Sequence, residues 1–355
     1  MNRFESIITL PSGRHIGEGQ PAYLIAELSG NHNGRLERAL ELVHAAKQAG
    51  ADAVKLQTYT ADTLTIDSDQ PYFRISGDNA WKGRTLYDLY QEASTPWDWH
   101  EALFAEARAL GLDVFSTPFD ETAVDFLEQL AAPIHKIASF EMTDHELVRR
   151  VAATMKPVIM STGMASVDEI REAVDVIADT GNRKLILLKC TSAYPSPLNE
   201  MNVRAIPTLS DLFGTPAGLS DHCLTERAAV ASIALGACVI EKHLTLARAD
   251  GGPDASFSLE PAEFRRMVDV VRETEQVLGD GVLGAGGTEV ANVVFRRSIF
   301  AVKDIPAGAV LTRDDIRVIR PGHGLAPKHL PIVLGRTVRC AIARGTPLTL
   351  DLLNP

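Results

Sequence analysis

Short apolar segments alternate with longer amphipathic segments between about residue 22 and residue 278. A short apolar run bounded by turn residues is typical of a buried β-strand, whereas apolar residues at helical spacing are typical of an amphipathic helix. Helix-like segments, for example residues 36–49 and 167–180, separate most of the apolar runs. We predict eight strands, at residues 23–26, 53–56, 113–115, 134–138, 158–160, 185–188, 217–219 and 238–241.

Glycines mark the ends of several predicted helices. Gly50, Gly111 and Gly181 each follow one, and a glycine there can adopt the left-handed conformation that often ends a helix. Eight strand–helix units in about 250 residues predict an α/β fold, a (β/α)8 TIM barrel. A doubly wound open sheet would be built from the same alternation and is the structural alternative.

Residues 58–96 are too many for a simple loop between a strand and a helix. Long ordered loops are often lids or binding loops. This excursion is also rich in aromatic side chains, namely Tyr72, Phe73, Trp81, Tyr87 and Tyr90. It is either a packed cover for the barrel or an aromatic lid that stacks on a sugar.

Glycines crowd residues 279–287 and mark the end of the regular pattern. We predict a catalytic barrel domain at residues 1–282, a glycine-rich linker at 283–292 and a small β-rich domain at 293–355, with β-like segments at 298–302 and 337–341. Some 60 residues form only a marginal core. The small domain is therefore expected to pack against a partner surface.

Composition excludes several classes of protein. The net charge of −11 argues against a nucleic-acid or anionic-membrane binder, because such proteins are usually basic. The chain holds no apolar run of about 18 residues, and its first residues lack the pattern of a signal peptide. Its four cysteines are widely spaced, which favours reduced thiols and a cytoplasmic location over a structural zinc site.

Polar residues follow nearly every predicted strand. In a TIM barrel the carboxyl ends of the strands meet at one mouth, where catalytic groups lie. Lys55 and Lys136 lie inside apolar strands, and with nearby hydroxyls they predict a site for a compact polyanion. Lys189 and Lys242 are alternatives that can point outward. The strand-end candidates are Glu27, Lys55, Gln57, Thr117, Lys136, Ser139, Ser161, Ser192, Tyr194, Ser220, His222 and His243.

His222 and His243 end two consecutive strands, so their rings can meet at one divalent ion. Two imidazoles with an open remaining coordination shell suit Mn²⁺, Co²⁺ or Zn²⁺ acting as a Lewis acid. A carboxylate such as Glu27 or Asp254 could reach the same region, directly or through water. Structural histidines are the alternative.

Several of these segments resemble the sialic acid synthase family. The matching motifs are AELSGNHNG at 26–34, FSTPF at 115–119, HKIASFE at 135–141, STGM at 161–164, GLSDH at 218–222 and EKH at 241–243. The segments Ile305-Pro306-Ala307-Gly308 and Ile319-Arg320-Pro321-Gly322 are similar to the family's C-terminal antifreeze-like (SAF) domain. The resemblance spans nearly the whole chain.

The resemblance implies a TIM barrel joined to an SAF domain, in a domain-swapped homodimer whose SAF domain covers the partner's active site. It implies phosphoenolpyruvate, an N-acetylated amino sugar in its open aldehyde form, and a divalent metal, usually Mn²⁺ with Mg²⁺ or Co²⁺ as alternatives. It also assigns a set of residues to each substrate. Phosphoenolpyruvate would lie on Lys55, Thr117, Lys136, Ser139, Ser161 and Ser220, the metal on His222 and His243, and the acceptor sugar near Gln57, Tyr194 and Asp254.

Three further assignments follow from the resemblance. Glu27 would be the acid/base group, with Tyr194 and Asp254 as further catalytic candidates, and Arg320 would contact the partner subunit's site. One departure concerns Ser192, because the family commonly has Cys-Thr-Asn where this chain has Cys-Thr-Ser. The Ser192 hydroxyl can still donate to an anion.

The excursion points to one branch of the family. Residues 56–60, 81–87 and 95–100 are most similar to the branch that makes pseudaminic acid from 2,4-diacetamido-2,4,6-trideoxy-altropyranose. The alternatives are a synthase of N-acetylneuraminic or legionaminic acid, or a carbohydrate-binding protein that has lost catalysis. The complete set of Glu27, Lys55, Lys136, His222 and His243 argues against the last of these.

Overall fold

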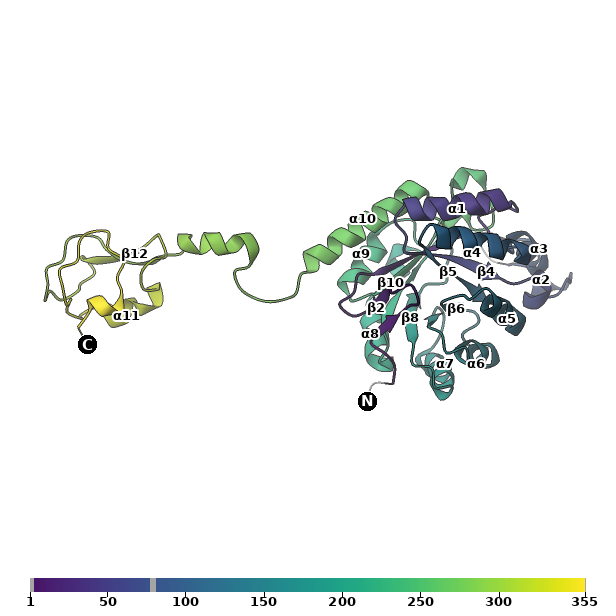
Figure 1. Cartoon of the computed structure of the whole chain (residues 1–355), viewed down its shortest axis with the longest axis horizontal. Helices are drawn as coiled ribbons and strands as arrows, with labels where there is room; N and C mark the ends of the chain where they lie inside the picture. The colour runs from purple at the N-terminus through teal and green to yellow at the C-terminus, as the bar shows by residue number, and fades with distance from the viewer. Residues whose placement is uncertain (1–2, 77–80, 355) are drawn as a thin grey trace. The chain divides into compact units, whose positions relative to one another are not determined.

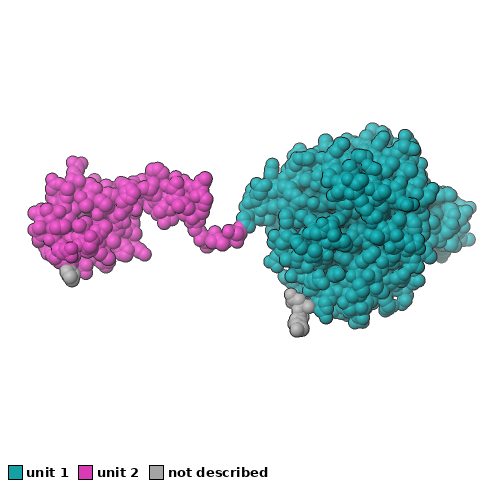
Figure 2. Space-filling model, in the orientation of Figure 1, with its two compact units in different colours: residues 1–279 teal, residues 280–355 magenta. Residues whose placement is uncertain are grey.

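The computed structural model describes residues 3–76 and 81–354. The chain forms two units, residues 1–279 and residues 280–355, which are coloured separately in Figure 2. The predicted linker at 283–292 falls inside the second unit. Each unit has its own buried core.

The first unit is a closed barrel of eight parallel strands. Each strand pairs with the next in the chain, and β10 closes the ring on β3, with Val239 opposite Tyr23. This closure confirms the predicted (β/α)8 barrel and excludes the open sheet. The strands are buried at nearly every residue, which is why short apolar runs mark them in the sequence, with polar residues mainly toward their carboxyl ends. They are β3 Tyr23–Glu27, β4 Ala53–Thr58, β5 Asp113–Pro118, β6 His135–Ile137, β7 Val158–Ser161, β8 Leu185–Cys190, β9 Ala217–Asp221 and β10 Val239–His243.

Helices surround the barrel (Figure 1). Several begin at capping side chains, as where Asp120 accepts hydrogen bonds from Thr122 N and Ala123 N at the start of α5. Ser166 and Glu169 form a capping box on α7, which satisfies backbone N–H groups that have no partner within the helix. The helices are α1 Leu36–Gln48, α4 His100–Ala109, α5 Glu121–Gln129, α6 His145–Ala152, α7 Val167–Asp179, α8 Ala205–Phe213, α9 Arg227–Ala234 and α10 Pro261–Leu278.

An N-terminal hairpin that the sequence pattern did not predict closes the amino end of the barrel. Its strands are β1 Ile7–Thr9 and β2 His15–Gly17. Ile8 and Ile16 are fully buried and belong to one cluster with side chains from the barrel interior, such as Phe115. The amino end is thus filled by apolar side chains, and the polar strand ends lie at the opposite mouth.

The excursion after β4 contains α2 Ala61–Leu64 and α3 Leu86–Ala93 with 3-10 turns at Pro71–Phe73 and Trp97–Trp99. Residues 77–80 of the predicted lid lie outside the described residues. Two tryptophans pack on the barrel: the Trp97 ring stacks on Phe126, and the Trp99 ring meets His32 edge-on. Trp97 and Trp99 lie just beyond residue 96, where the predicted excursion ends, so their packing does not decide between its two interpretations.

The second unit contains β11 Ser298–Ala301 paired with β12 Ile316–Ile319, and the short helix α11 Leu330–Val333. The predicted segment 298–302 is therefore a strand, whereas 337–341 makes only isolated bridges, through Thr337 and Val338. A 3-10 helix, Gly287–Phe295, begins inside the predicted linker. In the part of the chain that the structure describes, no helix is long and apolar enough to cross a membrane.

Candidate active site

The carboxyl ends of the barrel strands enclose a small polar cavity of about 70 Å³. Most of the predicted donor residues line it, so the barrel brings together side chains that are far apart in the sequence. Two buried lysines and four hydroxyls make it a site rich in hydrogen-bond donors. From the predicted set its lining includes Lys55, Gln57, Thr117, Lys136, Ser139, Ser161, Tyr194, Ser220, His222 and His243.

Lys136 is the least compensated charge in this cavity. Its side chain is 1% exposed, and its ammonium donates to the Ser161 hydroxyl at 2.7 Å and to the Ile137 carbonyl at 2.8 Å. Both acceptors are neutral. Burial lowers the pKa of Lys136, although the Glu241 carboxylate opposes the shift. A buried ammonium with only neutral hydrogen-bond acceptors is well suited to an anionic ligand.

Lys55 is shared between two buried carboxylates. Its ammonium forms an ion pair with Glu27, lies 3.7 Å from Glu241 and donates to the Thr117 hydroxyl at 3.2 Å. Burial raises the pKa of Glu27 to about 7, with Lys55 opposing the shift and Glu241 adding to it. Glu241 has Lys136 as well as Lys55 to compensate its charge, so Glu27 is the carboxylate that takes up a proton near neutral pH.

Glu27 itself lines neither this cavity nor the larger one described below. Its Oε1 atom accepts from Gln57 Nε2 at 3.2 Å and from Ser29 N at 3.1 Å. Gln57 and Lys55, which do line the cavity, are thus its hydrogen-bonded and ion-paired neighbours. Any proton that Glu27 exchanges with a ligand would pass through these neighbours or through water.

Ser139 and Ser192 meet around a glycine of the STGM motif. The Ser139 hydroxyl accepts from Gly163 N at 3.0 Å. A Cβ atom added at Gly163 would lie 2.2 Å from the Ser192 hydroxyl and 2.8 Å from that of Ser139, so only glycine fits there. Ser192 is absent from the lining of the cavity, and its hydroxyl lies 3.7 Å from Cys190 Sγ.

His222 and His243 lie side by side, with ring centroids 5.3 Å apart. The Nδ1 atom of His222 is 3.1 Å from the Thr191 carbonyl, and that of His243 is 3.2 Å from the Ser29 hydroxyl. A carbonyl can only accept, so Nδ1 of His222 carries a proton. Burial opposes a charge on this ring, but its hydrogen bond with Cys190 raises its pKa, so a metal at Nε2 would displace the second proton. Burial, with the positive charge of His222 adding to it, holds the pKa of His243 well below its usual range. Its neutral ring is therefore also fit for a divalent ion.

Two imidazoles meet at this place. Within residues 3–76 and 81–354, no three His, Cys, Asp or Glu side chains gather closely enough to hold a metal ion. Neither Glu27 nor Asp254 completes such a group. The two imidazoles thus fit a site whose remaining positions are filled by water or substrate.

A second, larger cavity of about 440 Å³ adjoins the first. The two share the lining residues Gln57, Phe119, Ala138, Phe140, Tyr194 and His243. The rest of the large cavity is mostly apolar and aromatic. It is lined by Tyr59, Leu64, Ile75, Trp81, Leu86, Leu89, Tyr90, Ala93, Glu141, Pro253, Asp254 and Phe257.

Trp81 connects the excursion to this cavity. Its indole N–H donates to the Pro253 carbonyl at 2.7 Å, and its ring lies 5.5 Å from Tyr194 and 6.0 Å from Phe257. The Tyr194 ring in turn lies 4.4 Å from His222. An aromatic wall therefore runs from the excursion to the histidine pair.

The NHNG part of the first motif holds the loop that carries Asp254. Asn31 Nδ2 donates to the Leu244 carbonyl and the Ser258 hydroxyl, each at 2.9 Å. Arg38 forms an ion pair with Asp250 at 2.7 Å. Asp254 lies on the wall of the large cavity, where burial raises its pKa despite hydrogen bonds that oppose the shift.

The assignment of roles from the sequence left out several residues that line these cavities, among them two glutamates and a phenylalanine. Glu241 accepts from Ser220 at 3.3 Å, and although burial opposes its charge, Lys136 and Lys55 hold its pKa below the usual range. Burial raises the pKa of Glu141 to about 7, and its Oε2 atom has no hydrogen-bond partner. Phe257 packs on His243 at 5.0 Å. Both glutamates belong to quoted motifs, and alternation along β10 places Glu241 on the same face as His243.

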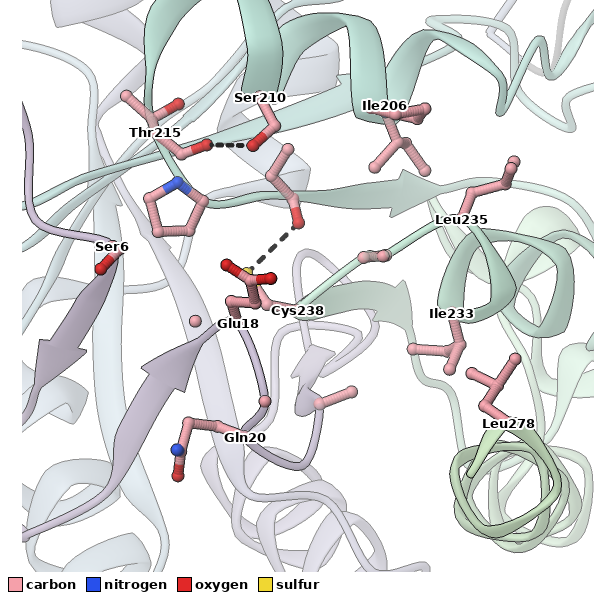
Figure 3. A pocket seen from close by; sticks show the side chains of 18 of the residues that line it. Ser6, Glu18, Gln20, Ile206, Ser210, Thr215, Ile233, Leu235, Cys238 and Leu278 are labelled. Atoms are coloured by element: carbon pink, nitrogen blue, oxygen red, sulfur yellow. Dashed lines mark hydrogen bonds between the residues drawn. The ribbon is translucent and has the colours of Figure 1, made fainter. Parts of the chain in front are cut away.

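Another cavity, of about 740 Å³, lies at the amino end of the barrel. Figure 3 shows its wall, formed by side chains such as Ile206, Ser210, Leu235 and Cys238. It contains none of the residues predicted for the site.

Arg320, the remaining residue predicted for the site, belongs to the second unit.

Comparison with known proteins gives consistent results over both units. Residues 42–283 match the NeuB family and residues 296–354 match the SAF domain. A pseudaminic acid synthase of Campylobacter jejuni is 44% identical over 92% of this chain and 95% of its own length. An N,N'-diacetyllegionaminic acid synthase of Legionella pneumophila is 36% identical over 94% of each chain. The crystal structure of an N-acetylneuraminic acid synthetase of Leptospira borgpetersenii has a TM-score of 0.73, with 30% identity, over 82% of this chain and 96% of that one.

Proposed function

The chain belongs to the NeuB family, and on that basis we propose that it is a phosphoenolpyruvate-dependent nonulosonic acid synthase. Its acceptor is 2,4-diacetamido-2,4,6-trideoxy-altropyranose, and its products are pseudaminic acid and phosphate. The observation that carries this proposal is the pair of adjoining cavities. One is small and lysine-lined, the other is larger and aromatic, and His243 lies on the wall of both.

The small cavity suits phosphoenolpyruvate. Its phosphate and carboxylate require charge-assisted donors once water is excluded, and Lys55 and Lys136 are the two buried ammonium groups in the lining. The hydroxyls of Thr117, Ser139, Ser161 and Ser220 supply further donors. Fixing the donor in one orientation lowers the entropic part of the barrier to reaction.

His222 and His243 are the residues that would hold a divalent ion, for which we propose Mn²⁺, with Mg²⁺ or Co²⁺ as substitutes. Such an ion supplies Lewis-acid polarisation of the acceptor's aldehyde. The two rings lie where the cavities meet, so the aldehyde end of the sugar would lie there too. The distal carbons of the sugar, with the second acetamido group and the methyl group, would then extend into the aromatic cavity.

The reaction forms one carbon–carbon bond and breaks one carbon–oxygen bond. Carbon 3 of phosphoenolpyruvate attacks the aldehyde carbon, and an oxocarbenium-like centre develops at carbon 2. Water adds to carbon 2, and the resulting tetrahedral intermediate expels phosphate. Glu27 moves a proton, either to the new alkoxide or from the water, through Gln57, Lys55 or a water molecule.

The choice of acceptor rests on two observations. The pseudaminic acid synthase of C. jejuni is more similar to this chain than the legionaminic acid synthase of L. pneumophila. The cavity next to the histidine pair presents aromatic and aliphatic walls to a sugar with a methyl and two acetamido groups. Synthases of N-acetylneuraminic or legionaminic acid are the competing functions, and no observation favours a carbohydrate-binding protein without catalysis.

We also propose that the protein is a homodimer in which the SAF domain of one subunit covers the barrel mouth of the other. The reason for this proposal is that the second unit is small and that its first residues expose apolar side chains, including Val282, Leu283 and Phe295. Arg320 would contact the acceptor in the partner's site, and a two-fold dimer allows each subunit to do the same. The free state of all four cysteines agrees with a reducing cytoplasm.

The direct test is phosphate release from phosphoenolpyruvate with a panel of acceptor sugars, followed by mass spectrometry and NMR of the product. We expect kcat/KM for the diacetamido altrose sugar to exceed that for N-acetylmannosamine by one to several orders of magnitude. A preference for N-acetylmannosamine would overturn the assignment of the acceptor. No phosphate release with any sugar would overturn the assignment as a synthase.

A further inference from the structure

Lys242 and Asp221 form a buried ion pair on the opposite face of the strands from the cavities. Both side chains are fully buried, and the ammonium lies 2.6 Å from Asp221 Oδ2. The two residues are register partners, on β10 and β9. Neither lines a cavity of the active site.

Asp221 comes directly before His222 in the chain, and Lys242 comes directly before His243. Side chains alternate along a strand, so Ser220, His222, Glu241 and His243 face the cavity while Asp221 and Lys242 face away from it. The ion pair therefore joins the two strands at the level where the histidines leave them.

Lys242 also holds the loop that follows His222. Its ammonium donates to the carbonyl of Cys223 and, at 3.2 Å, to that of Thr225. Asp221 Oδ1 accepts from Cys223 N at 2.9 Å. The backbone on both sides of His222 is thus fixed to one buried ammonium group that belongs to the strand of His243.

Stability alone is a poor explanation for this pair. Removing two charges from water is costly, and replacement of a buried pair by apolar residues of similar volume is often neutral or stabilising for the fold. Buried ionic groups in some proteins instead select one geometry among several. Here the geometry in question is the spacing of two imidazoles.

We propose that the Asp221–Lys242 pair is a positioning device that fixes the distance and orientation of His222 and His243 for a divalent ion. This inference rests on the metal site in the proposed function. Groups that orient metal ligands from behind typically contribute about 10–100-fold to metal affinity. The pair would act through the backbone rather than through a hydrogen bond to either ring.

The test uses Mn²⁺ alone with the full-length chain, with free Mn²⁺ measured by its solution EPR signal. The variant Asp221→Val/Lys242→Met removes both charges at once and so leaves no unpaired buried charge. We expect it to keep a cooperative thermal transition and to bind Mn²⁺ about 10–100-fold more weakly than the unmodified chain. Saturating Mn²⁺ should restore kcat with an unchanged KM for phosphoenolpyruvate, because the donor cavity is not altered.

Tyr23→Phe is the matched control. It removes a hydrogen bond of 2.9 Å to Asp113 Oδ2 at the amino end of the same barrel, and should leave the affinity for Mn²⁺ unchanged. If the double variant does not fold, Asp221→Asn decides, because Asn keeps the shape and an acceptor for Cys223 N.

Two outcomes would overturn the inference, and a third would overturn the metal site on which it rests. A folded double variant, or a folded Asp221→Asn, with unchanged Mn²⁺ affinity shows that the pair does not position the histidines. An equal loss of affinity in Tyr23→Phe shows a general effect of destabilisation. If His222→Ala binds Mn²⁺ as tightly as the unmodified chain, the metal site is not at the histidines. That result would contradict the proposed function rather than the positioning argument.

Discussion

Replacement of Lys136 by Met should change ligand affinity and stability in opposite directions. Met has a volume close to that of Lys but no charge and no donor. The ammonium that it removes is 1% exposed and hydrogen-bonded only to neutral oxygens, those of Ser161 and Ile137. Without ligand, this charge is a cost to the fold, whereas with phosphoenolpyruvate bound it faces an anion.

The size of each effect follows from the burial. Two unit charges 4 Å apart interact by about 4 kcal/mol at the effective dielectric constant of about 20 that describes protein sites. Because each 1.4 kcal/mol is about tenfold in affinity, we expect Lys136→Met to weaken binding of phosphoenolpyruvate by about two to three orders of magnitude. Burial lowers the pKa of Lys136 despite the opposing Glu241 carboxylate, which means that the fold disfavours this charge. The Tm of the ligand-free Lys136→Met protein should therefore stay level or rise.

Isothermal titration with phosphoenolpyruvate and a thermal melt of the ligand-free protein measure both effects. Lys189→Met is the control. This lysine is the last residue but one of β8, donates to Cys190 O and Thr191 Oγ1, and lines neither cavity. It should leave the affinity for phosphoenolpyruvate nearly unchanged. Unchanged affinity in Lys136→Met, or a Tm that falls by many degrees, would refute the reasoning.

Three further predictions concern the metal, the acid/base group and the second unit. Chelation of metal ions should abolish phosphate release, and added Mn²⁺ should restore it in the unmodified protein but not in His222→Ala. Full turnover by metal-free protein would contradict the metal site. Because burial raises the pKa of Glu27 to about 7, kcat/KM should change through pH 7 and lose this inflection in Glu27→Gln. A rate that falls as pH rises identifies an acid and one that rises identifies a base, whereas a flat profile from pH 6 to 8 excludes both. Glu27→Ala and Arg320→Ala, refolded together, should recover about a quarter of the original activity by random pairing; no recovery in verified mixed dimers would show that Arg320 does not act on the partner's site.

The barrel could be predicted from the sequence because each of its strands is buried on both faces and is followed by a helix. The apolar residues of such a helix recur at helical spacing, which distinguishes it from the strand. The N-terminal hairpin could not be predicted in the same way. Strands β1 and β2 have three residues each, too few for alternation to be distinguished from chance. Their role in closing the barrel depends on contacts of Ile8 and Ile16 with residues much later in the chain.

The lining of the small cavity was predictable for the same reason as the barrel. Once the strands are known, their last residues must converge at one mouth, and Lys55, Lys136, His222 and His243 all do. The lining of the large cavity was not predictable in detail. Trp81 reaches the cavity only because its indole N–H meets the Pro253 carbonyl, and no local pattern encodes a contact across that distance in the chain.

Part of the large cavity can be altered without touching the small one. Side chains such as Ile75, Leu86 and Tyr90 line the large cavity alone. If the proposed function holds, mutations there should alter which sugar is accepted without altering the lysines and hydroxyls of the small cavity. A library of variants restricted to those positions is therefore a route to synthases that make new nine-carbon sugars and keep the small cavity unchanged.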